Sequence, residues 1–509
     1  MKKYIFLFLS LLSTIKLRAQ EKGLDQRIDE AFQPISDFFS SVIFFEILGY
    51  PFVILLLVAS ALFFTLYFGF PNIRYFLTSI NVVRGKYDSV EKSDSKSEEG
   101  EVSHFQALAT AVSGTVGNGN IAGVALAIAL GGPGATFWMI ICGLLGMSTK
   151  FVECTLGVYY RDVDKDGVVY GGPMYYISRG LKSKGFKTLG TVAASLFAVF
   201  CIGGSFGGGN AAQSNQATIV IKNLFGYEST FAGAVIGVVL ATLVGIIIIG
   251  GIKRIASVTE KVVPFMALLY ILACIYILGI NFSFIDDAIG LIISEAFNPT
   301  AVGVGGIIGV LMVGFQRAAF SNEAGAGSAS IAHSAVKTKY AASEGLVALL
   351  EPFIDTVVIC TMTALVIITF NSTGAFVYGG DGTGAVLIDG VIYEGAAITQ
   401  MAFAEYIPGS DIFLTFAVVL FAVSTMISWS YYGLQSWKFL FGRGYIADLT
   451  YKVLFLMFVV IGAAASMNSI WAFSDAMIFA MVFPNMVGLY FLFPIVKEQL
   501  KKYLEAIKN

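Results

Sequence analysis

Charged residues are scarce in this chain. Asp, Glu, Lys and Arg make up 13% of its 509 residues, whereas 57% of them are hydrophobic. Soluble globular domains carry about 25% charged and roughly 45–50% apolar residues, so the composition excludes that class. It predicts a polytopic membrane protein in contact with the lipid bilayer. The net charge of −2 offers no basic excess for a nucleic-acid partner.

The chain also lacks the clusters of reactive residues that enzymes need. Its five cysteines all fall in apolar segments, so we expect no disulfide pair in the loops, and it has only two histidines. We find no cluster with metal-ligand spacing, no nucleophile motif and no phosphate-binding loop. The sequence therefore predicts neither an enzyme nor an ATP-driven pump, and no cofactor.

The N-terminus has the pattern of a signal peptide. Lys2 and Lys3 precede a short apolar core, Tyr4 to Leu12, and Ala19 suits cleavage. We predict a signal peptide over 1–20; the alternative, an uncleaved span, is disfavoured because a spanning helix needs about 20 apolar residues. Residues 21–104 would then hold an external segment, a first span near 50–70 and a charged cytoplasmic linker.

Ten further apolar segments follow this linker. They lie near 105–130, 135–160, 189–221, 229–251, 262–280, 301–332, 343–370, 409–430, 449–467 and 471–494. Lys and Arg concentrate in alternate loops and in the tail, 495–509, whereas 371–409 has neither. The positive-inside rule then places the mature N-terminus outside and the C-terminus in the cytoplasm. We predict an all-α protein with 11 transmembrane helices, most simply in a bacterial inner membrane.

Two of these segments contain residues that an unbroken spanning helix would avoid. The middle of 105–132 reads SGTVGNGN, from Ser113 to Asn120. Gly costs about 1 kcal/mol relative to Ala inside a helix, and a broken backbone in hydrocarbon needs protein or a polar cavity around it. The segment 301–332 turns polar at Gly314 to Arg317 and is rich in Gly and Ser from Ser321 to Ser330. Paired broken helices indicate a binding site.

The positions of these two segments divide the ten-span core into halves. We predict a first repeat over 105–280, an outer loop over 281–300 and a second, inverted repeat over 301–494. The first and sixth core helices, at the start of each half, would both be broken.

Several runs resemble the alanine or glycine:cation symporter family. They are GTVGNGNIAGVALAIALGGPGATFW (114–138), GGPMYYISRGL (171–181), GGGNAAQSN (207–215), FSNEAGAGSASIAHSAVKT (320–338) and FIDT (353–356). Asn118 and Gln316 depart from the residues common in that family. The resemblance implies a leucine-transporter-type fold of five plus five helices. It also implies sodium-coupled uptake of a small neutral amino acid, alanine or glycine.

Helix polarity then suggests where the substrate binds within that fold. The half-helix beyond the first break points its free N–H groups at the membrane midplane, so the substrate carboxylate is expected on the amides of Gly117, Asn118 and Gly119. The carbonyls that end the outer half of the sixth core span, near Val313 to Phe315, would suit the ammonium group. The other predicted contacts are Thr115, Asn210, Gln213, Phe315 and Gln316, with Phe206 and Met312 as further apolar walls.

The coupling ion is expected beside the same break. Val116 to Asn120 is similar to the unwound segment of sodium-coupled neurotransmitter-type symporters, which implies a sodium site with two adjacent hydroxyls on the eighth core span. We predict a site made by the carbonyls of Ser113 and Val116, the hydroxyls of Ser424 and Thr425, and Asn120. The alternative is that both hydroxyls bond their own helix.

Charges inside the membrane need partners. From sequence spacing we predict a Lys150–Glu153 pair at i, i+3 and a gate pair between Arg317 and Glu323 at the inner half of the sixth span. Glu351 and Asp355 would repel each other unless one is protonated or a cation lies between them. They could carry a proton or contact Arg317, and the alternative is that Asp355 bonds neighbouring spans. His104 and His333 are interpreted as structural.

A sodium-coupled symporter is thus the leading hypothesis from the sequence. A proton-coupled amino-acid transporter is the first alternative, and a cation channel whose glycine breaks line a filter is the second.

Overall fold

A computed structural model describes residues 23–91, 100–227, 229, 231–299, 306–380 and 382–508. The predicted signal peptide, 1–20, lies outside the described residues, as do part of the charged linker and the start of the predicted second repeat. The described chain is mostly helical, with three two-stranded antiparallel hairpins, β1–β2, β3–β4 and β5–β6.

The elements follow one another in three groups. The first holds α2 (Leu24–Ile43), β1 (Glu46–Ile47), β2 (Tyr50–Pro51), α3 (Phe52–Tyr67), α4 (Pro71–Arg74), α5 (Phe76–Val83) and α6 (Asp88–Glu91). The second holds α7 (His104–Thr115), η1 (Gly119–Gly123), α8 (Val124–Gly131), α9 (Gly134–Tyr159), β3 (Asp162–Val163), β4 (Val169–Tyr170), α10 (Pro173–Ser183), α11 (Lys187–Phe206), η2 (Gly207–Ala211), α12 (Ala212–Phe225), α13 (Ala232–Ile248), α14 (Gly251–Ile280), η3 (Phe282–Phe284) and α15 (Ile285–Phe297). The third holds α16 (Gly306–Asn322), α17 (Ser330–His333), α18 (Ala341–Ala348), α19 (Leu350–Pro352), η5 (Phe353–Cys360), α20 (Thr361–Phe370), η6 (Asn371–Thr373), β5 (Val386–Ile388), β6 (Val391–Tyr393), α21 (Ala396–Tyr406), α22 (Ser410–Phe441), α23 (Tyr445–Ala464) and α24 (Met467–Ala506).

Local sequence signals explain several helix boundaries. Ser103 and Gln106 form a capping box at the start of α7, each side chain accepting a hydrogen bond from the other residue's backbone N–H. Pro173 occupies the first turn of α10, where a missing N–H costs nothing. Gly226 ends α12 in the left-handed conformation that a side chain would disfavour.

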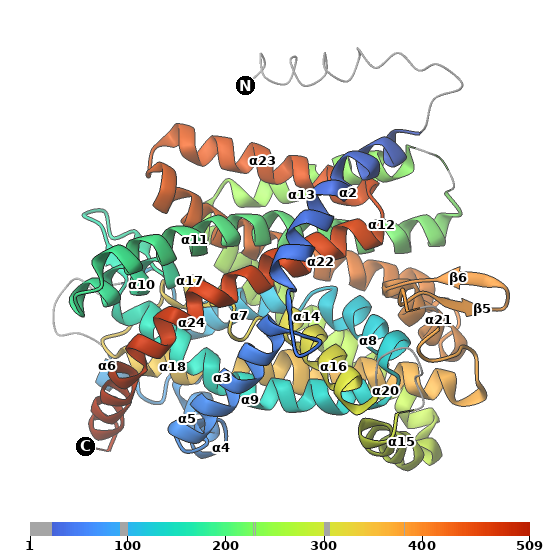
Figure 1. The fold of residues 1–509 in the computed structure, drawn as a ribbon, viewed down its shortest axis with the longest axis horizontal. Helices are drawn as coiled ribbons and strands as arrows, with labels where there is room; N and C mark the ends of the chain where they lie inside the picture. The colour runs from blue at the N-terminus through green and yellow to red at the C-terminus, as the bar shows by residue number, and fades with distance from the viewer. Residues whose placement is uncertain are drawn as a thin grey trace.

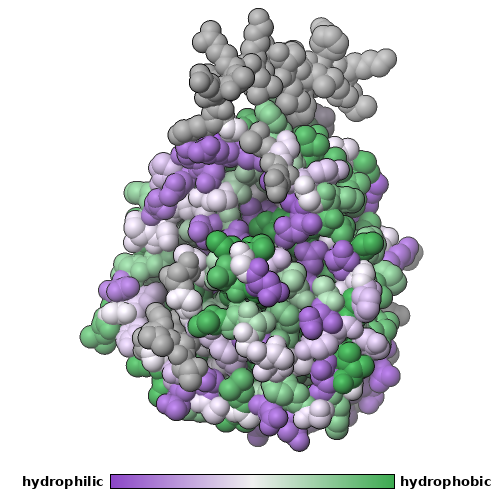
Figure 2. Space-filling view, turned by 90° about the vertical axis from the view of Figure 1, so that its right-hand side faces the viewer, coloured by the Kyte–Doolittle hydropathy of each residue, from purple (hydrophilic) through white to green (hydrophobic). Residues whose placement is uncertain are grey.

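Long helices, among them α9, α11, α22 and α24, run between two ends of the molecule (Figure 1). At one end lie α6, α10 and the C-terminal part of α24, and we call it the linker end. At the other lie α15, α21 and the β5–β6 hairpin, and we call it the hairpin end. Hydrophilic residues are spread across the hairpin end (Figure 2), as expected of a surface that meets water.

Within the described residues, seven helices are long and apolar enough to cross a membrane, and eight if the bent pair α7 with η1–α8 counts as one span. Two shorter apolar helices, α3 and α13, accompany them. The prediction of a helical polytopic membrane protein is confirmed. The count of 11 spans, the inverted repeat and the domain boundaries remain predictions, and α15 forms a helix within the predicted outer loop 281–300.

Candidate functional site

The first predicted break is present in the structure. The α7 helix ends at Thr115, the π-helix η1 begins at Gly119, and the two helical pieces meet at an angle of 51°. The backbone here approaches α22 closely, because a Cβ on Gly117 would lie 2.4 Å from Thr425 Oγ1. Glycine at residue 117 is therefore a requirement of packing as well as of the break.

The C-terminal end of α7 is joined to α22 by two hydrogen bonds. Thr425 Oγ1 donates to the Ser113 carbonyl at 3.0 Å, and Ser113 Oγ donates to the Ser424 carbonyl at 2.8 Å. The Ser424 hydroxyl instead donates to Phe421 O of its own helix at 3.0 Å. Of the predicted sodium ligands, the structure thus brings Ser113 and Thr425 together, while Val116 is the buried residue that caps α7.

Amide side chains occupy two of the N–H groups that we assigned to the substrate carboxylate. Gly117 N–H donates to Asn120 Oδ1 at 2.8 Å, and Asn118 N–H donates to Gln213 Oε1 at 2.9 Å. Asn118 Nδ2 also donates to the Gln213 carbonyl at 3.1 Å. Oxygen acceptors therefore lie where the prediction places carboxylate oxygens, and they come from the protein itself.

The second break lies further along the chain than the sequence suggested. The α16 helix continues through Gly314 and Arg317 to Asn322, so the predicted break at Gly314 to Arg317 is wrong. The backbone leaves the helix at Glu323, whose φ is 56°, and α17 begins at Ser330. Gly314 is instead a packing glycine, because its Cβ would lie 2.7 Å from the Ala135 carbonyl of α9.

Three residues predicted around that position contact α9 and α24. Phe315 is buried, and its carbonyl lies 3.9 Å from Cys142 Sγ of α9. Gln316 Nε2 donates to Asp475 Oδ2 of α24 at 3.0 Å. Arg317 forms an ion pair with the same carboxylate, so the predicted Arg317–Glu323 pair is wrong.

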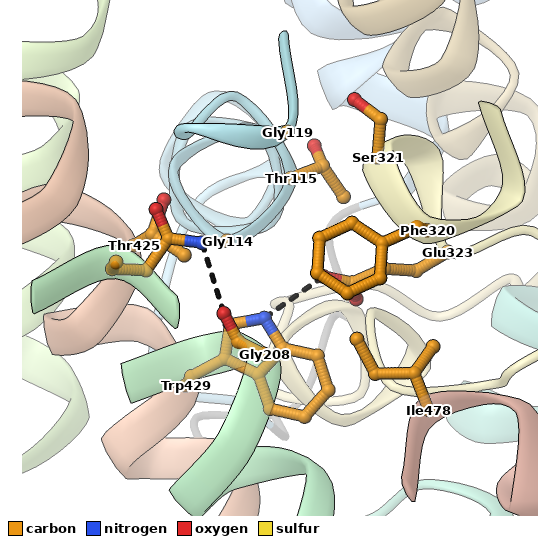
Figure 3. Close-up of a pocket in the computed structure, with 11 residues that line it drawn as sticks. Gly114, Thr115, Gly119, Gly208, Phe320, Ser321, Glu323, Thr425, Trp429 and Ile478 are labelled. Carbon is orange, nitrogen blue, oxygen red and sulfur yellow. Dashed lines mark hydrogen bonds between the residues drawn. The ribbon is translucent and has the colours of Figure 1, made fainter. Parts of the chain in front are cut away.

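A small pocket lies between the two breaks (Figure 3). It has about 10 Å³ of free space, room for about one water molecule, and its lining comes from α7, η1, η2, α12, α16, the second break, α22 and α24. The lining residues are Gly114, Thr115, Gly119, Gly208, Gln213, Phe320, Ser321, Glu323, Thr425, Trp429 and Ile478. Predicted residues Thr115, Gly119, Gln213 and Thr425 are among them, whereas Asn210 and Phe315 are not.

Glu323 contributes a buried carboxylate to this pocket. Trp429 Nε1 donates to Glu323 Oε1 at 2.8 Å, and Ser328 Oγ donates to Glu323 Oε2. Phe320 and Ile478 lie on the same side of the view as Glu323 (Figure 3). The apolar wall is therefore formed by Phe320, Ile478 and Trp429 rather than by Phe206 and Met312; Phe206 stacks on Phe458 of α23.

A second polar cluster, centred on Asp355, lies next to the first break. Asn120 Nδ2 donates to Asp355 Oδ1 at 2.6 Å, and Ser321 Oγ donates to Asp355 Oδ2 at 2.9 Å. Thr356 Oγ1 donates to the same oxygen at 2.7 Å, and all four side chains are buried. A carboxylate among hydroxyl and amide groups is a donor set that a hard cation could use. The sequence showed Asp355 as an intramembrane charge but not its link to Asn120.

The polar face predicted on the third core span mostly joins helices. Asn210 Nδ2 donates to the Phe455 carbonyl of α23 at 2.6 Å. Asn215 donates to the Gly462 carbonyl at 3.1 Å, and Gln216 Oε1 accepts from Ala396 N–H of α21 at 2.9 Å. Within this face, Gln213 is the residue that lines the pocket.

Intramembrane charges pair differently from the predicted spacing. Lys150 Nζ bonds Glu351 Oε1 at 2.9 Å, so the predicted Lys150–Glu153 pair is wrong. Glu153 instead accepts from Asn485 Nδ2 at 2.7 Å. The sequence suggested a partner for Lys150 on its own helix, α9. In the fold, α19 brings the carboxylate of Glu351 closer to Lys150.

Known proteins resemble this chain over most of its length. A model of the sodium:alanine symporter family matches residues 35–509. The sodium/alanine symporter AgcS of Methanococcus maripaludis is 39% identical over 90% of this chain and 95% of its own. The amino-acid carrier protein AlsT of Bacillus subtilis is 34% identical over 89% of this chain and 90% of its own. Among solved structures, MhsT in complex with L-phenylalanine has a TM-score of 0.49 and 13% identity over 79% of this chain and 100% of its own, a likeness too distant to carry a conclusion.

Both relatives are similar over nearly their whole length, and the matched family consists of transporters rather than enzymes. The chain belongs to the sodium:alanine symporter family.

Proposed function

We propose that this protein is a secondary active symporter that couples inward sodium flux to the uptake of alanine or glycine. It would work by alternating access in the inner membrane, with the linker end in the cytoplasm and the hairpin end outside. The observation that carries the proposal is the small pocket between two helix breaks, which is lined by amide, hydroxyl and carboxylate groups.

The pocket's chemistry suits a small zwitterion. Two neutral side-chain oxygens, from Asn120 and Gln213, accept from the amides of Gly117 and Asn118. A substrate carboxylate could replace Gln213 Oε1 on the Asn118 amide and would gain from the partial positive charge at this helix start. The Glu323 carboxylate and the carbonyls that end α7 offer acceptors for an ammonium group.

The pocket's size limits the substrate side chain. Its free space is about 10 Å³, room for about one water molecule, so a substrate has to push the pocket's walls apart. Phe320, Ile478 and Trp429 close its apolar side. This favours an amino acid whose side chain is a hydrogen or a methyl group.

Two clusters could hold sodium, which prefers oxygen ligands. One joins Thr425 Oγ1 to the Ser113 carbonyl, and the other surrounds Asp355 with Asn120 and Ser321. Both contact residues of the first break. Sodium binding would therefore organise the backbone that holds the substrate, which is a physical basis for coupling.

A contact between α16 and α24 would close the hairpin side of the pocket. Arg317 of α16 pairs with Asp475 of α24 and lies over the rings of Phe320 and Trp471, at 5.7 and 5.6 Å from their centroids. Phe320 is itself a wall of the pocket. Separation of Arg317 from Asp475 would open a route from the hairpin end, as alternating access requires.

A binding experiment with two adjacent variants tests this assignment. Purified protein should bind radiolabelled alanine in sodium but not in choline. Thr425→Val should raise the half-saturating sodium concentration by about tenfold, because it removes the hydroxyl oxygen that would contact the sodium ion. Ser424→Ala is the matched control and should change it little, since that hydroxyl bonds its own helix. Equal alanine binding in sodium and choline would contradict the proposal.

A further inference from the structure

The chain's two histidines share one carboxylate. His104 Nδ1 bonds one oxygen of Glu344, and His333 Nδ1 bonds the other at 2.5 Å. Glu344 and His333 are fully buried, and His104 is 9% exposed. Neither the pocket nor the two candidate sodium clusters includes any of these three residues.

The bonded chain continues on both sides of this group. His104 Nε2 bonds Glu91 Oε2 at 2.6 Å, and Glu91 Oε1 accepts from the Tyr503 hydroxyl at 2.6 Å. On the other side, His333 Nε2 lies 3.5 Å from Glu351 Oε2. Glu351 Oε1 bonds Lys150 Nζ at 2.9 Å.

We call the six residues Glu91, His104, Glu344, His333, Glu351 and Lys150 the Glu–His chain. It lies at the linker end and joins elements that are far apart in sequence. His104 is the first residue of α7, and His333 is the last residue of α17. These helices are the linker-side pieces of the two broken segments. Glu344, on α18, therefore bridges the two pieces that must separate for the pocket to open toward the linker end.

The charge balance of the Glu–His chain depends on protons. It contains three carboxylates, from Glu91, Glu344 and Glu351, and one permanent cation, Lys150. The sum is −2 when both imidazoles are neutral and zero when both are protonated. An uncompensated buried charge is strongly destabilising, so protons bound by this group stabilise its closed packing.

The groups that surround the Glu–His chain do not remove this dependence on protons. Glu153 and Glu323 also lie near Lys150, and both are acidic. Cys154 of α9 faces the same lysine. Thr338 Oγ1 donates to Glu91 Oε2 at 3.0 Å, and Tyr503 is uncharged in the ordinary pH range. A further permanent cation, Arg161, donates to the carbonyls of Ser334, Val336 and Thr338, which follow His333 in the chain. Lys150 is the permanent cation that bonds a carboxylate of the Glu–His chain.

We propose that the Glu–His chain is a proton-binding site that latches the linker end. Two protons, one on each imidazole, hold α7 and α17 against Glu344. Their loss leaves net negative charge among buried carboxylates, so the two helices separate and the pocket becomes accessible from the linker end. The inference does not depend on sodium or alanine.

Hydrogen exchange of the purified full chain in lipid nanodiscs tests the proposal. We expect the amides of α7 and α17–α18 to be protected near pH 6. After correction for intrinsic exchange, they should exchange at least about tenfold faster near pH 9, and reversibly. Amides of α11 and α23 should keep their protection, which distinguishes local opening from unfolding. If the exchange of the α7 and α17–α18 amides does not change with pH, the proposal is overturned.

Variants show whether the pH dependence of exchange comes from protons on the histidines or from other titrating groups. Glu344→Gln should abolish the pH step, because the shared carboxylate is gone, and the double variant His104→Gln with His333→Gln should exchange fast at every pH. Glu498→Gln is the matched control, since Glu498 lies exposed on the same linker-end part of α24, and it should keep the step. A pH step that persists in Glu344→Gln would contradict the latch, even if the double variant fails to fold.

Discussion

A Cβ atom on residue 117 would lie 2.4 Å from Thr425 Oγ1 and 3.0 Å from Gln213 Oε1. Both of these atoms contact the first break, through the Ser113 carbonyl and the Asn118 amide. The smallest side chain would therefore displace a candidate sodium ligand and a candidate substrate contact together.

Gly117→Ala is expected to destabilise the protein by about 1–3 kcal/mol through overpacking and to abolish sodium-dependent alanine binding. Gly279→Ala is its control, because Gly279 lies in α14 with no neighbouring atom within 4 Å of the added Cβ. The control should melt at the same or a slightly higher temperature, since Ala is the better helix former. Normal alanine binding by Gly117→Ala would show that the close approach is unimportant.

Asp355 gives a second prediction at the level of one residue. Asp355→Asn keeps the size of the side chain but removes its charge, and hydrogen bonds to charged groups contribute roughly 1.5–3 kcal/mol. The half-saturating sodium concentration for alanine uptake should rise by about ten- to hundredfold. Glu405→Gln, an exposed change on α21, should leave it unaltered. An unchanged sodium dependence in Asp355→Asn would remove this cluster from the coupling scheme.

The sequence allowed us to predict which residues lie together at the first helix break. Ser113, Thr425 and Gln213 do meet at the first break, because free helix ends need partners. Asn210 and Gln213 share one face of a helix and could not be told apart from sequence. Their different roles depend on the helices that pack against them. Asn210 donates to a carbonyl of α23, whereas Gln213 lines the pocket.

The two broken helices show what sequence reveals about elements. The first break was located correctly because Gly and Asn alternate there, a composition that an unbroken helix disfavours. The second was placed too early, because Gly314 and Arg317 interrupt the apolar pattern for reasons of their own. Gly314 allows close contact with α9, and Arg317 pairs with Asp475, whereas the Gly- and Ser-rich run that follows forms the break.

The pairing of α9 with α19 carries a prediction about stability. Lys150 and Glu351 are both fully buried, so removing one partner leaves an uncompensated charge. Lys150→Met should destabilise the protein by about 3–5 kcal/mol, and adding Glu351→Gln should recover part of the loss. Thermal unfolding of the single and double variants measures this. Lys502→Met, which breaks an exposed pair with Glu498, should leave the melting temperature nearly unchanged.

The β3–β4 hairpin at the linker end provides a pH prediction. Hydrogen bonds from Arg443 and Arg179 hold the pKa of Asp162 below its ordinary value. A lowered folded-state pKa means that the contact contributes its full stability above the ordinary Asp pKa of about 3.9 and loses it as pH falls below that value. Hydrogen exchange in 162–170 should therefore accelerate as pH falls through this range, after intrinsic correction. Asp162→Asn should remove that acceleration. If exchange still accelerates at low pH in Asp162→Asn, a group other than Asp162 is responsible.

At the scale of the whole molecule, we propose that contacts of different chemistry close the pocket toward its two ends. The Arg317–Asp475 contact would close the hairpin side, and the Glu–His chain would hold the linker side. Composition and hydrophobic segments were sufficient to predict a helical membrane protein. They could not predict these closures, because each one joins residues more than a hundred positions apart in the chain.

The most direct test of the central claim is uptake of radiolabelled alanine by proteoliposomes under separately imposed gradients. We predict that an inward sodium gradient drives accumulation that is saturable in alanine and stops when the sodium gradient is dissipated, even with a pH gradient in place. Accumulation that ignores sodium and follows the imposed pH gradient, or ion flux without fixed alanine stoichiometry, would contradict sodium-coupled symport.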